Sequence, residues 1–155
     1  MEEVKTMEKA SDEAMDDVQY IDVKIGNEQY GINIQYIDNI VRNQRITRVP
    51  KAQSYYKGVI NLRGEIIPVM SIRLKLGLED DNYTDKTRII IIKVDGATIG
   101  VIVDQVKEVV TLESTDIETV ARSGSLVGSG YISAIGKNND ELISLLDIVA
   151  LIEES

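Results

Sequence analysis

Short apolar runs, separated by glycine-rich or polar turns, recur along this chain and predict an all-β protein. They come in the same order in each half: a strand, its return after a tight turn, a third strand, and a strand pair closed by a short amphipathic helix. The first half is predicted to hold strands at Val18–Ile25, Gln29–Ile34 and Ile37–Val41 and a helix at Ile72–Leu76. The second half is predicted to hold strands at Arg88–Val94, Thr98–Val103 and Val106–Leu112 and a helix at Leu146–Glu154, N-capped by Asp147.

The stretch from Gly58 to Leu76 reads as two apolar strands joined by a turn at Arg63-Gly64. Gly64 can take the positive φ angle that a tight hairpin turn requires. Pro68 interrupts the second of these strands. Because proline has no N–H to donate to a ladder, we expect this strand to be an edge strand or to carry a bulge.

The two halves match each other residue by residue, which indicates an internal duplication. The segment IDVKIGNEQYGINI at residues 21–34 aligns with IIIKVDGATIGVIV at residues 90–103, and Gly31 falls opposite Gly100. The match continues through the third strands, where Ile37, Ile40 and Val41 correspond to Val106, Val109 and Val110.

A second set of matches covers the strand pair. Gly58 aligns with Gly130 and Gly64 with Gly136, after which the second half has four inserted residues at 137–140. Residues 65–72 then match residues 141–148. Five short strands in each half favour two small barrels packed together, because closing a barrel removes the exposed edges of strands rich in Val and Ile. The polar segment Glu79–Thr87 is expected to separate the halves.

Composition excludes several kinds of chemistry. The chain of 155 residues contains no His and no Cys, so histidine acid–base catalysis, histidine metal sites, zinc–thiolate sites and disulfides are ruled out. No apolar run approaches the length of a membrane span, and the acidic N-terminus is unlike a signal peptide. We therefore expect a cytoplasmic protein without a cofactor, without direct membrane insertion and without enzymatic activity.

Charge is distributed unevenly along the chain, whose formal net charge is −9. Residues 1–17 hold seven acidic and two basic residues and little apolar periodicity, so we expect a disordered acidic tail there. Residues 42–75 hold eight basic residues and one acidic residue. This basic zone either binds an acidic partner or forms a solvated face. The glycine-rich run at residues 123–130 lacks the spacing of a phosphate-binding loop and is expected to be a flexible loop.

Three segments give the chain a resemblance to the CheW family of bacterial chemotaxis coupling proteins. They are YGINIQYIDNIV at residues 30–41, GVINLRGEIIPVMSIRLKLG at residues 58–77 and IGVIVDQVKEVV at residues 99–110. The element N-L-R-G-x-I-x-P within the second is the most specific. The resemblance extends over nearly all of residues 18–152 and implies two five-stranded SH3-like barrels, packed and intertwined, within one domain at residues 18–155. The subdomains would span about residues 18–80 and 86–155, with possible strand exchange.

The resemblance implies a non-catalytic adaptor that links chemoreceptors to the histidine kinase CheA. The implied partners are the barrel-type regulatory domain of a CheA-type kinase and the helical signalling tip of methyl-accepting chemoreceptors. The protein would then be cytoplasmic and recruited to membrane-associated receptor arrays. Within the family, receptor tips bind in a groove between the barrels, whereas no kinase-binding residues are assigned from this sequence.

Five positions fall where family members contact partners, and they are the candidate receptor-binding residues: Ile37, Asn39, Arg63, Val106 and Val109. Asn39 stands where many relatives carry Glu, so a salt bridge there is not expected in this chain. An apolar strip of Ile37, Val106 and Val109 beside polar Asn39 and Arg63 would suit an amphipathic helix. Val106 and Val109 are three residues apart, so they share a strand face only if a bulge or bend lies between them.

Two other functions stay open at this point. A small barrel that binds nucleic acid is the main alternative, supported by the basic zone at residues 42–75 and opposed by the acidic net charge and scattered aromatic residues. A small enzyme is the third reading, weakened by the missing His and Cys. Binding to oligonucleotides that falls steeply with salt would indicate the former, and turnover of a substrate would indicate the latter.

Overall fold

The computed structural model describes residues 17–119 and 130–153. Its strands and short helices follow the predicted order. In the first half they are β1 (Asp17–Ile25), β2 (Glu28–Asn33), β3 (Ile37–Arg42), β4 (Tyr56–Leu62), β5 (Glu65–Ser71) and α2 (Ile72–Lys75). In the second half they are β6 (Arg88–Val94), β7 (Ala97–Val103), β8 (Gln105–Glu113), β9 (Ile117–Thr119), β10 (Ile132–Asn138), β11 (Glu141–Leu146) and α3 (Ile148–Glu153). Two 3-10 turns, η1 (Ile34–Tyr36) and η2 (Ser114–Asp116), lead into β3 and β9.

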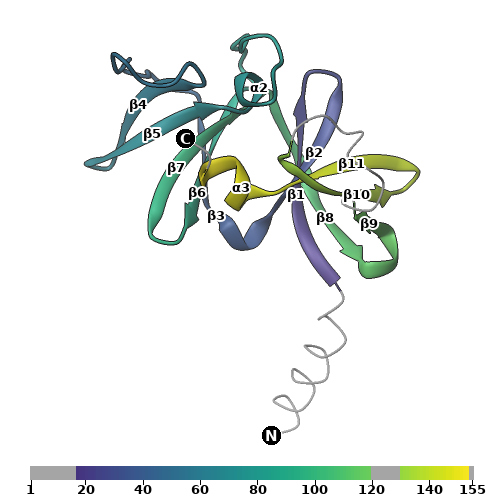
Figure 1. Cartoon of the computed structure of the whole chain (residues 1–155). Helices are drawn as coiled ribbons and strands as arrows, with labels where there is room; N and C mark the ends of the chain where they lie inside the picture. The colour runs from purple at the N-terminus through teal and green to yellow at the C-terminus, as the bar shows by residue number, and fades with distance from the viewer. Residues whose placement is uncertain (1–16, 120–129, 154–155) are drawn as a thin grey trace, which may run out of the picture.

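The strands form two sheets, and each sheet takes strands from both halves of the sequence (Figure 1). Barrel A has the strand order β8-β1-β2-β11-β10-β9, and barrel B has the order β3-β6-β7-β5-β4. In both, the first two strands of one half lie between strands contributed by the other half. The exchange is joined by parallel pairs, β2 with β11 and β5 with β7. The expected all-β fold of two intertwined SH3-like barrels is therefore confirmed.

The internal repeat is also visible in the strand register. The pairing of β1 with β2 recurs between β6 and β7 at positions 69 residues further along, with Ile21 opposite Ile32 and Ile90 opposite Val101. At the two exchange points Gly31 lies opposite Leu145 and Gly100 lies opposite Val69. We call positions related in this way twins. The predicted match of Gly31 with Gly100 is confirmed by the register.

Three clusters of buried apolar side chains hold the fold together. The largest, which we call the junction core, draws on β1 and β2 of barrel A, on β6 and β7 of barrel B, and on α2 and α3. Each barrel also has a small core of its own, one around Ile89 and Ile91 in barrel B and one around Leu112 and Ile143 in barrel A. Burial of apolar surface is the main favourable term in folding, so the junction core makes the two barrels one unit.

Most local predictions are confirmed. The hairpin turn at Arg63-Gly64 has positive φ at both residues, and so does the Asp95-Gly96 turn. The Asp147 carboxylate accepts a hydrogen bond from the Ala150 N–H at 3.0 Å and caps α3 as expected. At the twin helix α2, the Ser71 hydroxyl accepts a hydrogen bond from the Leu74 N–H.

Two expectations about the strand pairs were wrong. The strand that contains Pro68 is internal, because β5 lies between β7 and β4. Proline is tolerated there because the pairing of β5 with β7 starts at the following residue, Val69. The bulge of this hairpin lies in β4, where Lys57 is the extra residue between Tyr56 and Gly58.

The match of Gly64 with Gly136 was the second error. Gly136 lies inside β10, opposite Ile143, and the turn of this hairpin is Asn139-Asp140. The two hairpins have the same register at positions 76 residues apart, so the four additional residues precede the second hairpin and do not lie within it. The short edge strand β9 was not predicted, and in barrel B a bridge between Thr47 and Val59 occupies the corresponding place.

Two predicted features fall on residues that the structure does not describe. The expected acidic tail lies outside the described residues except for Asp17, which is the first residue of β1. The glycine-rich run at residues 123–130 lies outside them except for Gly130.

Candidate functional site

The predicted apolar strip lies on the two edge strands β3 and β8, which are twins of each other. In both, one extra residue bulges out against the partner strand: Lys107 in β8 against β1, and Asp38 in β3 against β6. The bulge in β8 falls between Val106 and Val109, as their spacing requires. Directly paired side chains of antiparallel strands lie on the same face.

Val106 pairs with Val23 and Val109 with Ile21, and both partners belong to the junction core. Val106 and Val109 therefore lie on one sheet face. Their exposure differs, however. Val106 is half-buried and packs on the junction core, whereas the side chain of Val109 is 53% exposed. Ile37, the twin of Val106, is likewise half-buried against the junction core.

The two polar candidates occupy different places. Asn39 is half-buried in β3, and its side-chain oxygen accepts a hydrogen bond from the Ile40 N–H at 2.8 Å. Arg63 is exposed at the tip of the β4–β5 hairpin, which extends to the side of the molecule opposite β8 (Figure 1). The structure thus places Ile37 and Val106 against one common core, Asn39 beside them on β3, and Arg63 away from β8.

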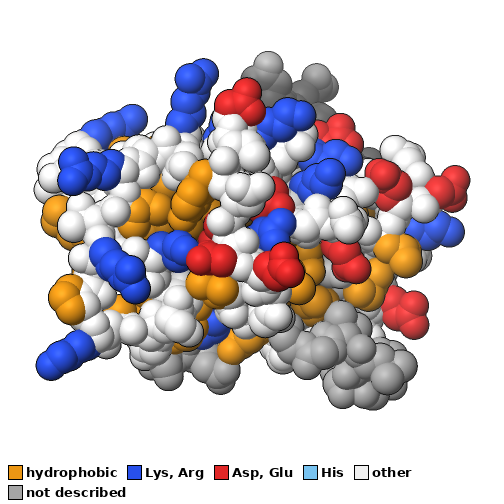
Figure 2. Space-filling model, turned by 90° about the horizontal axis from the view of Figure 1, so that it is seen from above, with side chains coloured by type: hydrophobic (Ala, Val, Ile, Leu, Met, Phe, Trp, Pro, Cys, Tyr) orange, Lys and Arg blue, Asp and Glu red, His pale blue; other side chains and the backbone are white. Residues whose placement is uncertain are grey.

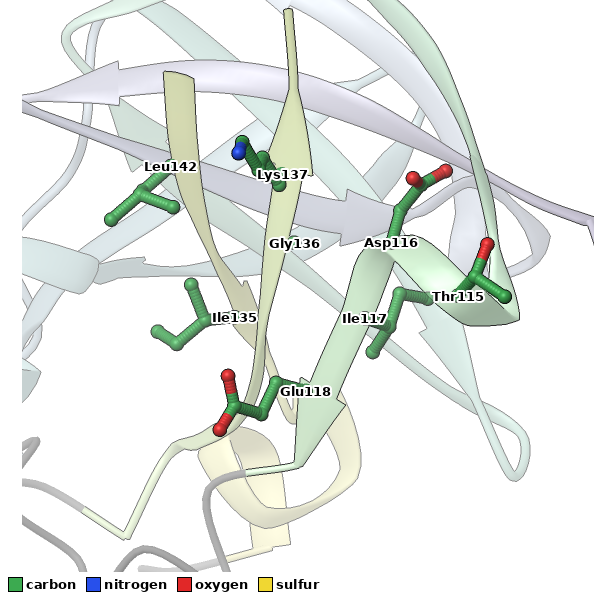
Figure 3. A pocket seen from close by; sticks show the side chains of 8 residues that line it. All are labelled: Thr115, Asp116, Ile117, Glu118, Ile135, Gly136, Lys137 and Leu142. Atoms are coloured by element: carbon green, nitrogen blue, oxygen red, sulfur yellow. The ribbon is translucent and has the colours of Figure 1, made fainter. Parts of the chain in front are cut away.

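Two further apolar side chains stand out on the outer faces of the hairpins. Ile66 on β5 is 59% exposed and Leu142 on β11 is 66% exposed, and they are twins. Around Leu142, the side chains of Ile117 and Ile135 and those of Glu118 and Lys137 line a cavity of about 220 Å³ (Figure 3). Figure 3 shows Ile135 and Leu142 pointing to the same side of their hairpin. We call these surfaces the β4–β5 face and the β10–β11 face.

The two faces differ in charge. The β4–β5 end carries much of the basic zone, including Arg48 and Arg63, whereas acidic Asp116, Glu118 and Glu141 lie at the β10–β11 end. Figure 2 shows Lys and Arg side chains gathered toward the β4–β5 side and Asp and Glu side chains toward the β10–β11 side. Since charge complementarity steers association and suppresses wrong partners, we expect the twin faces to select different partners.

A third polar cluster fixes α2 to the β1–β2 turn. The Asp104 carboxylate accepts hydrogen bonds from Arg73 Nε at 3.0 Å and Arg73 Nη2 at 2.6 Å, and also from the Gly26 N–H at 2.8 Å. Burial alone would raise the pKa of Asp104, but the hydrogen bonds from Arg73 and Gly26 lower it overall. A cavity of about 360 Å³ opens beside this cluster, lined by Tyr30, Leu78 and others. The cluster is a structural clamp, with its charges already paired.

Within the described ranges, no group of three or more His, Cys, Asp or Glu side chains is placed to hold a metal ion. No helix in the part of the chain that the structure describes is long and apolar enough to cross a membrane. What the surface offers instead is exposed apolar side chains at three places, on β8, β5 and β11.

Sequence reasoning missed the two hairpin faces. Ile66 and Leu142 lie in apolar runs, Glu65-Ile66-Ile67 and Glu141-Leu142-Ile143, in which adjacent residues point to opposite faces. A signal was present, because Ile67 and Ile143 are buried and the preceding or following apolar residue must then face outward. Strict alternation after the turn would have identified both outward positions.

The chain was compared with known proteins. The family model described as CheW-like domain matches residues 19–155. The chain is 34% identical to the chemotaxis protein CheW of Helicobacter pylori over 137 residues, which is 88% of this chain and 82% of that protein. It is 33% identical to the chemotaxis protein CheW of Bacillus subtilis over 84% of this chain and 83% of that protein. The crystal structure of scaffolding protein TtCheW from Thermoanaerobacter tengcongensis superposes with a TM-score of 0.80 at 29% identity, covering 88% of this chain and 92% of that one.

Proposed function

This chain belongs to the CheW family of chemotaxis proteins, and we propose that it couples chemoreceptors to a CheA-type histidine kinase as a non-catalytic adaptor. An adaptor must hold two partners at once, so it needs separate surfaces on one rigid body. The junction core joins both barrels into one unit, and exposed apolar side chains lie on β8 and on both hairpin faces. This separation of exposed surfaces on a single body is the observation that carries the proposal.

The receptor surface in this proposal is the strip on β3 and β8. A receptor tip is helical, and an amphipathic helix binds through apolar side chains spaced along one face. Val109 provides the exposed apolar contact, while Ile37 and Val106 support it from the junction core and Asn39 supplies a polar rim. Because Asn39 is uncharged, the matching position of the receptor needs no basic residue.

The kinase surface in this proposal is formed by the hairpin faces around Ile66 and Leu142. A regulatory domain built from similar barrels would present strands and apolar side chains of its own, and exposed Leu142 with Ile117 and Ile135 suits such a contact. Arg63, at the tip of the basic hairpin, would pair with an acidic residue of that domain or of the receptor. The adaptor would act in the cytoplasm, at membrane-associated receptor arrays.

The proposal is tested by capture of purified CheA-type kinase on the immobilised chain, with and without its barrel regulatory domain. We expect capture of the intact kinase and loss of capture when that domain is deleted. Capture that survives the deletion would contradict the assignment of the regulatory domain as partner. An oligonucleotide titration in the same buffer is the control for the nucleic-acid alternative, for which affinity would fall steeply with salt.

A further inference from the structure

One buried carboxyl group has no role in the surfaces described above. Asp22 lies in β1 with a side chain that is 1% exposed, and its Oδ1 atom has no hydrogen-bond partner among the described residues. An ionised carboxylate is costly to bury without a compensating partner, and buried polar groups are nearly always paired. The exception therefore calls for an explanation.

The duplication supplies a direct comparison. The twin of Asp22 is Ile91 in β6, which is equally buried and belongs to the core of barrel B. Asp22 pairs with Gly31 and Glu108, and Ile91 pairs with the twin residues Gly100 and Asn39. The same backbone arrangement, including the bulge in the neighbouring edge strand, thus forms around an apolar side chain. The carboxyl group is not needed to build the fold.

The charges around Asp22 come from the two strands that pack beside it. Burial raises the pKa of Asp22 to about 6, the Lys107 charge opposes the rise, and Glu141 and Glu108 add to it. The unfolded chain has the ordinary value of 3.8, so the ionised group stabilises the unfolded or opened state more than the closed one. The sign is clear: this weakening is absent at low pH, grows as pH rises through the interval from about 4 to 6, and is complete at neutral pH.

The weakening falls on one particular strand. β8 is an edge strand of barrel A, held by its pairing with β1, and Asp22 lies opposite the bulge in that pairing. Opening of β8 away from β1 would expose the carboxyl group to water and remove the cost of burying it. We propose that Asp22 is a positioning residue that keeps β8 easily displaced from β1, so that the Val106–Val109 surface can adjust to its partner.

The functional part of this inference rests on the proposed receptor surface, whereas the structural part does not. In the free chain, β8 should open more readily than its twin β3, which pairs beside apolar Ile91. Local opening of this kind is measured by amide hydrogen exchange, which reports free energies of opening segment by segment.

The experiment is hydrogen exchange by mass spectrometry on the full chain at pH 7.5, for the wild type and for Asp22→Asn, Asp22→Ile and Ile91→Asp. Two units of pKa correspond to about a hundredfold in the opening equilibrium. We expect both Asp22 variants to slow exchange of β8 amides by at least about tenfold while β3 amides keep their rates. Ile91→Asp should accelerate β3 in the same way. The ratio of wild-type to Asp22→Asn exchange rates should shrink toward one between pH 6 and 4.

Equal exchange of β8 in the wild type and both Asp22 variants would overturn the inference. So would a uniform change over all strands, because a merely structural residue would shift global stability without singling out β8. Failure of both Asp22 variants to fold would also contradict it, since removal of the buried charge is predicted to stabilise barrel A. None of these results depends on receptor binding, so the inference and the proposed function can fail separately.

Discussion

Replacement of Gly31 by alanine tests how the two halves are joined. Gly31 lies at the point where β2 meets β11, opposite Leu145, so strands from different halves approach each other there. A Cβ atom at this position would lie 2.7 Å from Leu145 Cδ2, 3.2 Å from Ile143 Cγ2 and 3.5 Å from Tyr20 Cβ. Carbon atoms in contact are normally about 3.5–4.0 Å apart. The Leu145 methyl group must therefore move by most of an ångström inside a filled core.

The expected cost follows from these overlaps. Overpacking a filled core by one carbon destabilises by about 1–3 kcal/mol. Loss of backbone freedom in the unfolded chain returns about 0.4–1 kcal/mol when glycine becomes alanine. We therefore expect Gly31→Ala to lower the free energy of unfolding by about 1–2 kcal/mol, measured by urea denaturation. Gly130→Ala is the matched control, because a Cβ there meets nothing within 4 Å, and its effect should stay within about 0.5 kcal/mol.

A double-mutant cycle shows whether the clash is the cause. Leu145→Ala removes the methyl group that Gly31→Ala would strike, so the two changes together should cost less than the sum of their separate effects. We expect a favourable coupling of about 1 kcal/mol or more. If Gly31→Ala is as stable as Gly130→Ala, or if the cycle shows no coupling, the close approach of β2 and β11 is not as described.

Three shorter predictions concern charge and the N-terminus. Arg63→Asp should keep the circular dichroism spectrum and weaken partner binding by about 1–3 kcal/mol in a titration, since Arg63 is exposed at a turn. Asp104→Asn should lower the free energy of unfolding by about 1–3 kcal/mol at pH 7. The wild type should lose this contribution as pH falls below about 4, because the folded state lowers the pKa of Asp104. Deleting residues 1–17 should leave the thermal midpoint and kinase affinity nearly unchanged.

The sequence predicted the strands well because their turns are chemically explicit. Glycine at 64 and 96 permits positive φ, and each turn is flanked by apolar runs whose alternation sets the length of the strands. The duplication added a second, independent signal, since Gly31 and Gly100 mark the two points where β-strands cross between halves. Patterns that act within a hairpin are readable from sequence for this reason.

The pairing between hairpins was harder to predict. Pro68 suggested an edge strand, yet β5 is internal because its partner strand β7 starts to pair one residue later. Such a detail depends on the long-range arrangement of strands, and proline alone reports only that one N–H is missing. The strand β9 was missed because it has three residues, too few for alternation to be recognised.

The candidate site was predictable in part. The spacing of Val106 and Val109 required a bulge, and Lys107 provides it. Exposure could not be read from the pattern, because Val106 and Val109 are the same residue type on the same face and differ in what lies above them. Asp22 was missed for a similar reason: in an alternating strand an acidic residue is expected to face solvent, and here it faces a barrel interior.

The central claim is that receptor and kinase use separate surfaces of one adaptor, and it is tested most directly by paired titrations of two matched variants. Val109→Asp and Leu142→Asp each place a carboxylate at an exposed apolar position, so both should fold, which circular dichroism checks. Each variant is titrated with a receptor-tip fragment and with the kinase regulatory domain. We predict that Val109→Asp weakens receptor binding by about 2 kcal/mol and spares kinase binding, and that Leu142→Asp does the reverse. Equal losses for both partners in either folded variant would contradict the account.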